Sequence, residues 1–217
     1  MVRVKICCIS SPEEARLAIS LGAAALGLVG PMPSGPGVIS NEQIAVIARL
    51  VPPPVATFLL SSETEVDALI AHHRQVRTST LQLVDALQEQ DYAPLRAGLP
   101  GVKLVQVIHV LNEASVAEAL RAAPHVDALL LDSGNPNLAV KELGGTGRVH
   151  NWTLSRQICE QSPVPVFLAG GLHADNVQQA LDAVQPFGLD LCSGVRTNGH
   201  LDADKLAAFM VAINGWR

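Results

Sequence analysis

Charged residues are scarce in this sequence of 217 residues. Asp, Glu, Lys and Arg make up 16% of the chain, and the formal net charge is -5. Such a chain lacks the basic face that nucleic-acid binding requires, and it lacks the extreme acidity of a disordered tail. Long apolar runs are also missing, because Gly and Pro interrupt every stretch before the roughly 20 residues that a membrane helix needs. We therefore expect a small molecule as partner, and neither nucleic acid nor a membrane.

Motifs that bind metals or dinucleotides are absent as well. The four cysteines form no CxxC pair, and the seven histidines show neither His-x-His nor His-x-x-x-His spacing. We therefore expect no metal site and no disulfide framework. No Gly-x-Gly-x-x-Gly follows the first predicted strand, which weakens the case for a dinucleotide-binding domain. The amino terminus reads directly as a strand and lacks the apolar run of a secretory signal, so we expect a cytoplasmic protein.

What the sequence does contain is a regular alternation of two patterns, within a composition that is 48% apolar. Short apolar runs rich in β-branched residues predict eight strands, at residues 2–8, 25–29, 55–60, 80–84, 104–110, 128–131, 164–168 and 189–192. Helical spacing predicts helices between most of them, at residues 11–19, 41–48, 65–72, 113–122, 174–183 and 202–213. Strands that are apolar on both faces suit a parallel sheet covered by helices. The prediction is a single-domain (β/α)₈ TIM barrel formed by residues 1–217, with an open doubly wound sheet as the alternative.

Two residues at predicted strand ends are candidates for proton transfer. Asp132 ends an apolar run, and burial beside apolar neighbours favours a general-acid role, although Asp-Ser-Gly-Asn-Pro is equally good turn chemistry. Cys7 occupies the matching place near the end of the first predicted strand, where a thiol can accept a proton. A cysteine in an apolar strand is more often core filler, which is the preferred interpretation for Cys8, Cys159 and Cys192. Because strand neighbours point to opposite faces, we expect at most one of Cys7 and Cys8 to face a site.

Three glycine-rich segments follow predicted strands. In barrels, the loops after strands seven and eight commonly bind phosphate through backbone N–H groups and a helix N-terminus. We therefore predict a phosphate site whose residues are Gly170, Gly171, Ser193, Gly194 and Val195. Tight turns are the structural alternative for either loop alone. The third segment lacks the Lys-Ser/Thr ending of a nucleotide P-loop and is interpreted as a lid over the substrate, formed by Gly144, Gly145, Thr146 and Gly147.

Taken in order, five motifs resemble those of the phosphoribosylanthranilate isomerase family of tryptophan biosynthesis. They are Val4-Lys-Ile-Cys7, Asp127-Ala-Leu-Leu-Leu-Asp132, Gly144-Gly-Thr-Gly147 with His150-Asn-Trp152, Ala169-Gly-Gly171, and Asp190-Leu-Cys-Ser-Gly-Val195. The resemblance implies a cofactor-free Amadori rearrangement, in which an aminoribose phosphate opens and isomerises to an aminoketose. It also implies that Asp132 protonates the ring oxygen and that Cys7 removes the C2′ proton. A monomer and a homodimer are both compatible with the sequence.

The sequence departs from the family pattern at three places, two of which concern the aromatic half of the substrate. Cys8 stands where the family usually has glycine. Ser34-Gly-Pro-Gly37 lacks the arginine that pairs with the anthranilate carboxylate, and Gln82-Leu-Val-Asp85 replaces Gln-Leu-His-Gly. We expect weak activity on phosphoribosylanthranilate unless Arg196, Arg148 or Lys141 supplies the missing charge from another loop.

Three alternatives remain at this point. The chain acts on a different N-glycoside or phosphosugar, or it is a non-catalytic phosphosugar-binding barrel. Retention of both Cys7 and Asp132 favours an enzyme, because a binding protein needs neither. A Schiff-base aldolase ranks last, because it needs a lysine at the carboxyl end of a strand, whereas Lys103 begins its strand and Lys5 lies in the middle of one.

Overall fold

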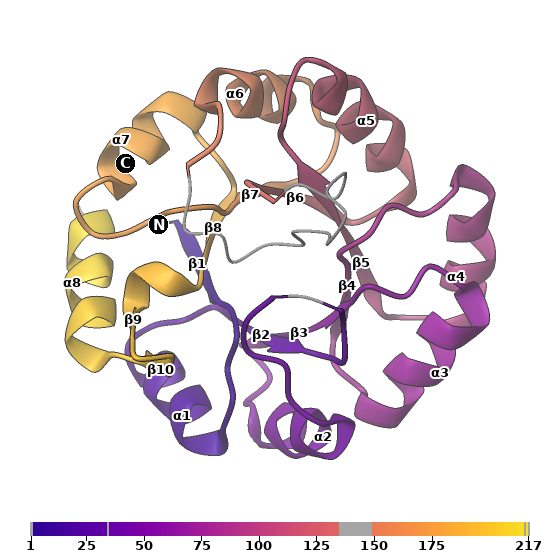
Figure 1. Cartoon of the computed structure of the whole chain (residues 1–217), viewed down its shortest axis with the longest axis horizontal. Helices are drawn as coiled ribbons and strands as arrows, with labels where there is room; N and C mark the ends of the chain where they lie inside the picture. Colours follow the sequence, from indigo (N-terminus) through magenta and orange to yellow (C-terminus); the bar gives the residue numbers. More distant parts are fainter. Residues whose placement is uncertain (1, 34, 135–148, 215, 217) are drawn as a thin grey trace.

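Eight parallel strands form a closed barrel in chain order, with α-helices around it (Figure 1). The computed structural model describes residues 2–33, 35–134, 149–214 and 216. The strands are β1 (Arg3–Ile6), β2 (Ala25–Val29), β3 (Ala56–Ser61), β4 (Thr80–Leu83), β5 (Lys103–His109), β6 (Ala128–Asp132), β7 (Val166–Leu168) and β8 (Gly188–Leu191). Strand β1 pairs with β8 from Arg3 opposite Gly188 to Ile6 opposite Leu191, which closes the ring. The predicted barrel is confirmed, and the open sheet is wrong.

The helices that cover the barrel begin at side-chain caps in several cases. Ser11 accepts a hydrogen bond from the Glu14 N–H, and Ser40 accepts one from the Gln43 N–H. The helices are α1 (Pro12–Ser20), α2 (Asn41–Leu50), α3 (Val66–Val76), α4 (Tyr92–Gly98), α5 (Ala114–Ala122), α6 (Trp152–Gln161), α7 (Val177–Val184) and α8 (Ala203–Ile213). Within the described residues, none of the helices has the length and apolar character needed to cross a membrane.

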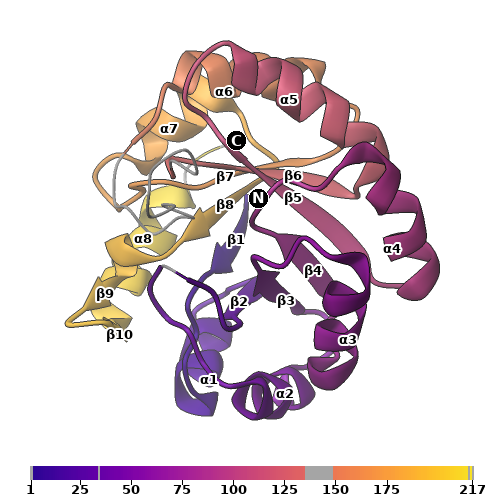
Figure 2. The same cartoon turned by 45° about the vertical axis from the view of Figure 1, so that its right-hand side comes forward.

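The sequence analysis missed three elements. Helix α4 is only seven residues long and has a proline at its third position, so its apolar period is too short to recognise. Helix α6 carries a recognisable start signal, since Asn151 caps it by accepting from the Thr153 N–H. A short antiparallel hairpin of β9 (Arg196–Thr197) and β10 (His200–Leu201) lies between β8 and α8 and projects from the barrel (Figure 2).

Side chains alternate between two apolar layers because the period of a strand is two residues. One layer lies between the strands and the helices, and includes Ile6, Leu59, Leu81 and Leu131. The other fills the inside of the barrel, and includes Phe58, Val105, Leu130 and Phe167. The same alternation turns the polar side chains at positions 5, 82, 132 and 190 toward the barrel axis, so the carboxyl end of the barrel is polar.

A buried ion pair lies at the closing seam of the barrel. The Lys5 ammonium donates to the Asp190 carboxylate at 2.8 Å, and both side chains are almost fully buried. Burial alone would lower the pKa of Lys5, but the charge of Asp190, the neighbouring Cys7 and Cys8 and the hydrogen bond to Asp190 together outweigh burial and raise it above the usual value. A lysine held protonated and paired in this way is not a Schiff-base nucleophile, which argues against the aldolase alternative.

We predict that Lys5→Met lowers the free energy of unfolding by about 3–5 kcal/mol, because it leaves a carboxylate buried without a partner. Urea unfolding of purified protein measures the loss. Lys103→Met is the matched control, since Lys103 pairs with Asp127 at 3.0 Å but is 67% exposed, and it should cost about 1 kcal/mol or less. Equal losses in the two variants would contradict the role assigned to the buried pair.

Candidate active site

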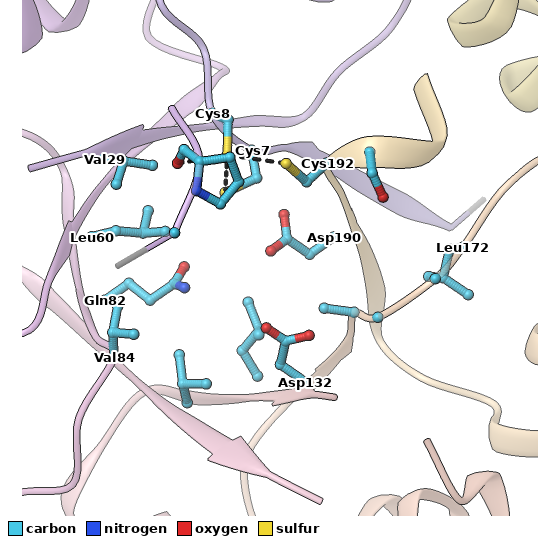
Figure 3. A pocket seen from close by; sticks show the side chains of 18 of the residues that line it. Cys7, Cys8, Val29, Leu60, Gln82, Val84, Asp132, Leu172, Asp190 and Cys192 are labelled. Carbon is cyan, nitrogen blue, oxygen red and sulfur yellow. Dashed lines mark hydrogen bonds between the residues drawn. The ribbon is translucent and has the colours of Figure 1, made fainter. Parts of the chain in front are cut away.

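A cavity opens at the carboxyl ends of the strands, inside the ring of loops (Figure 3). Its floor is apolar and includes Val29, Leu60, Val107 and Leu130. Its polar wall comes from thiols, two carboxylates, one amide and glycine-rich backbone. The residues that provide this wall are Cys7, Cys8, Gln82, Asp132, Gly170, Gly171, Asp190, Cys192, Ser193 and Gly194.

Cys7 and Asp132 reach the cavity from different strands. Cys7 follows β1, and its N–H continues the ladder by donating to the Leu191 carbonyl at 2.7 Å. Asp132 is the last residue of β6, and its Oδ1 accepts from the Ser133 N–H at 2.7 Å. Figure 3 places the two side chains on different sides of the cavity, with the Asp190 carboxylate also directed into it. The fold therefore leaves room for a small ligand between a thiol and a carboxyl group.

The loops after β7 and β8 approach the cavity through glycine backbone. Gly170 and Gly171 have φ angles of 87° and 62°, which favour glycine. A side chain at position 194 would place its Cβ 2.0 Å from the Leu172 carbonyl oxygen, so only glycine fits where the two loops touch. Val195 does not join the other four predicted phosphate residues on the cavity wall. It is buried, and its N–H donates to the Cys192 carbonyl.

Both adjacent cysteines line the cavity, so the expectation that at most one of them faces a site is wrong. Strand β1 ends at Ile6, and Cys8 has a left-handed φ of 61°, so the alternation of strand side chains stops before this pair. The two sulfur atoms lie 3.8 Å apart. A left-handed backbone is the conformation that glycine adopts without strain, and glycine is what the related family usually has here.

Arg196 ties the loop after β8 to the loop after β1. Its guanidinium donates to the Cys7 and Cys8 carbonyls at 2.9 and 2.6 Å and pairs with Glu14 at 3.1 Å, and its side chain is only 8% exposed. These hydrogen bonds all go to acceptors within the protein itself. Arg196 is therefore committed to holding the backbone of Cys7 and is not free to pair with a substrate carboxylate.

Two further candidates for the missing charge, and the expected lid, belong to a segment that the structure does not describe. The residues in question are Arg148 and Lys141 for the charge, and Gly144, Gly145, Thr146 and Gly147 for the lid, all of which lie outside the described residues. Of the pair that departs from the family pattern, Val84 lines the cavity and Asp85 does not. The lining contributed by the described residues contains no Lys or Arg.

Three lining residues received no role in the sequence analysis. Gln82, Asp190 and Cys192 all point inward, as the period of two predicts from the neighbouring positions 84 and 188. The Gln82 amide is directed into the cavity, and its oxygen is buried without a hydrogen-bond partner among the described residues (Figure 3). A buried amide without a partner is costly, so a ligand that hydrogen-bonds to it gains affinity.

The fold and the cavity define a (β/α)₈-barrel enzyme with its site at the carboxyl ends of the strands. Residues 4–212 match the family model described as N-(5'phosphoribosyl)anthranilate (PRA) isomerase, and the chain belongs to this family. The N-(5'-phosphoribosyl)anthranilate isomerase of Methanocella arvoryzae is 33% identical over 90% of this chain and 89% of its own length.

Solved structures agree with this assignment. Phosphoribosyl anthranilate isomerase from Thermotoga maritima superposes with a TM-score of 0.82 at 29% identity, covering 99% of this chain and 100% of its own. A second structure, at 27% identity and a TM-score of 0.80, covers 99% of this chain and 100% of its own. It is a complex of the isomerase with reduced 1-(o-carboxyphenylamino)-1-deoxyribulose 5-phosphate.

We predict that Glu14→Gln destabilises the protein at pH 7 by about 1.5–3 kcal/mol, because the Arg196 clamp loses its charged partner. Burial alone would raise the pKa of Glu14, but the N–H groups of Leu201 and Ser10 and the charge of Arg196 lower it below its usual value. A lowered pKa means that this stability is present above about pH 4.3, the usual value for Glu, and is lost as the pH falls through the folded-state pKa.

The measurement is urea unfolding of wild type and variant between about pH 3 and pH 7, where the difference between them should shrink toward acid. Glu160→Gln is the matched control, since Glu160 pairs with Arg156 on α6 but is 57% exposed. A difference between wild type and Glu14→Gln that stays constant over this range would contradict the prediction.

Proposed function

We propose that this chain catalyses the cofactor-free Amadori rearrangement of N-(5'-phosphoribosyl)anthranilate. The observation that carries the proposal is the position of Cys7 and Asp132 on one cavity, beside two glycine loops. The substrate is thus a phosphorylated small molecule, and the product is an aminoketose phosphate. The proposed location is the cytoplasm. Fractionation of cells that express a tagged chain tests this location.

Asp132 acts as the general acid in the first step. It donates a proton to the ring oxygen of the ribose while the C1′–O bond breaks, and the anthranilate nitrogen supplies the electron pair that forms an iminium ion. The hydrogen bond from the Ser133 N–H fixes the carboxyl group at the end of β6. The apolar floor beneath it keeps water away from the opened intermediate.

Cys7 acts as the general base in the second step. Its thiolate removes the C2′ proton, the electrons neutralise the iminium nitrogen, and the resulting enol tautomerises to the ketone. The Lys5 ammonium lies close to this sulfur. A Cβ built on Gly27 would stand 3.0 Å from Lys5 Nζ and 3.1 Å from Cys7 Sγ, so the missing side chain at position 27 leaves room for both.

The phosphate of the substrate binds at the loops after β7 and β8. The backbone N–H groups of Gly171 and Gly194 are the proposed donors, since neither donates to an acceptor within the described residues. The opposite end of the substrate meets the Gln82 amide, whose NH₂ and carbonyl groups suit a carboxylate or a hydroxyl. The family match and the isomerase relative favour neither of the two alternatives. These were catalysis on a different phosphosugar and binding without catalysis.

We predict that Cys7→Ala and Asp132→Asn each lower kcat by about 10²–10⁴, because each removes one proton-transfer group. The conversion of phosphoribosylanthranilate is followed by its fluorescence. Growth of a tryptophan auxotroph that lacks the isomerase reports the same loss in cells. Cys159→Ser, on the outer helix α6, is the control and should retain wild-type kcat. Variants of Cys7 and Asp132 that keep wild-type kcat would overturn the assigned roles.

We also predict that an arginine at position 37 improves the enzyme only when Cys8 is replaced by glycine. Gly37 has a φ of 77°, and a Cβ there would lie 2.5 Å from the Cys8 Cβ, so Gly37→Arg alone clashes and should lose stability. Cys8→Gly removes the contact with the Cys8 Cβ and the left-handed strain at position 8, which is worth roughly 1–2 kcal/mol and offsets the strain of a side chain at the left-handed position 37.

The double variant should therefore fold and should raise kcat/KM by about tenfold, as expected from one charge-assisted hydrogen bond of about 1.5 kcal/mol or more. The kcat/KM values and thermal midpoints of wild type, both single variants and the double variant form the test. A double variant that is no faster than Cys8→Gly alone would mean that the aglycone carboxylate binds elsewhere.

A further inference from the structure

Three thiols meet at the mouth of the barrel. The sulfur of Cys8 lies 3.0 Å from the sulfur of Cys192 and 3.8 Å from the sulfur of Cys7 (Figure 3). All three line the cavity and all three are reduced. Catalysis as proposed above uses Cys7 alone, so Cys8 and Cys192 have no role in the reaction.

The backbone around Cys8 and Cys192 suits a disulfide. Strands β1 and β8 are paired up to Ile6 and Leu191, and the Cys7 N–H extends this pairing by one more hydrogen bond. The register places Cys192 opposite Cys7, and Cys8 follows one residue later, at the ends of two strands that run about 4.8 Å apart. The Cα atoms of a disulfide lie about 4.4–6.8 Å apart, a range that includes such a diagonal neighbour. The 3.0 Å contact between their sulfur atoms shows that the Cys8 and Cys192 side chains point toward each other.

Of the two thiols, Cys192 is the one suited to attack an oxidant, because the hydrogen bonds with Cys192 and Cys7 and burial raise the pKa of Cys8. The hydrogen bond with Cys8 lowers the pKa of Cys192, and the positive charge of Arg196 lowers it further. A thiolate is the form of cysteine that attacks an oxidant. Cys192 is partly exposed to the open cavity, so a small oxidant can reach it.

We propose that Cys8 and Cys192 form a reversible disulfide when the protein meets a peroxide. The Cys192 thiolate attacks one peroxide oxygen, the O–O bond breaks, and a sulfenic acid and a hydroxide form. The Cys8 thiol then attacks the sulfenic sulfur, the S–O bond breaks, and the OH group leaves with the Cys8 proton as water, while the proton that Cys192 released on ionising neutralises the hydroxide. Both sulfur atoms are oxidised, and the peroxide is reduced to water.

The disulfide changes the phosphate loop as well as the thiols. An S–S bond is about 2.05 Å long, so the sulfurs must move together from 3.0 Å. Cys192 directly precedes Ser193 and Gly194, and this movement shifts the backbone that is proposed to hold phosphate. We therefore expect weaker binding of inorganic phosphate to the oxidised protein. This second consequence rests on the proposed phosphate site, whereas the disulfide itself does not.

Peptide mapping of the whole chain after treatment with hydrogen peroxide tests the pairing. Trypsin leaves Cys7 and Cys8 on one peptide, residues 6–16, and Cys159 and Cys192 on another, residues 157–196. The expected product is a cross-link between these peptides that has lost two hydrogen atoms and disappears on reduction. Cys8→Ser, Cys8→Gly and Cys192→Ser should each abolish the cross-link. Cys159→Ser is the matched control and should keep it.

The variants separate the possible pairs. A cross-link that survives in Cys192→Ser, or a bond within the first peptide, would overturn the assignment to Cys8 and Cys192. Cys8→Gly relieves the left-handed backbone at this position, so its circular dichroism and thermal midpoint show whether a lost cross-link reflects unfolding. Binding of inorganic phosphate to the reduced and oxidised proteins, measured by calorimetry, tests the second consequence. Equal affinities would overturn it and leave the peptide map to decide the pairing.

Discussion

The Arg196 guanidinium joins the loops that follow the first and the last strand of the barrel, and the geometry of the site depends on it. A barrel has one seam where its last strand meets its first, and here both neighbouring loops carry cavity residues. Arg196 crosses that seam to bind the Cys7 and Cys8 carbonyls and the Glu14 carboxylate. It fixes the loop that presents the proposed base relative to the loop that is proposed to hold phosphate. Two groups of one site that come from opposite ends of the chain thus share one anchor.

The Lys5 and Asp190 pair holds the same seam one layer deeper. Its position inside the barrel has two consequences. The pair holds the Lys5 ammonium beneath the cavity and the Asp190 carboxylate in its wall, and it places a positive charge near the sulfur of Cys7. A buried ion pair contributes little net stability because desolvation offsets the attraction. The pair therefore matters less for net stability than for keeping the two side chains together in place, since either charge alone would be costly to bury.

The fold could be predicted from the sequence because its signal is repeated. Eight apolar runs and the helices between them each supply part of the evidence, and errors at their ends do not change the architecture. Helix α4 was missed because seven residues with a proline give too little periodicity, and α6 because its cap at Asn151 was not used. The carboxyl ends of β1 and β6 also follow from the pattern, which is why Cys7 and Asp132 were identified as candidates.

The details of the site could not be predicted, because they depend on contacts between distant parts of the chain. The alternation rule separated Cys7 from Cys8, but it applies only within a strand, and the chain leaves β1 before reaching them. Arg196 was considered for substrate binding because the sequence does not reveal that Glu14 and two backbone carbonyls already occupy it. Gln82 has the pattern of an ordinary strand residue, and only the fold shows that its amide faces the cavity with an oxygen that has no partner among the described residues.

Two of the departures from the family pattern are physically a single change. Residues 8 and 37 are far apart in sequence, yet a Cβ at position 37 would lie 2.5 Å from that of Cys8. Only one of the two positions has space for a side chain. The family pattern places glycine at the first and arginine at the second, and this chain has the reverse arrangement, with the side chain at position 8. The anthranilate end has therefore exchanged a charged group on one loop for a thiol on the other. The phosphate loops and the proposed acid and base are the same in both arrangements.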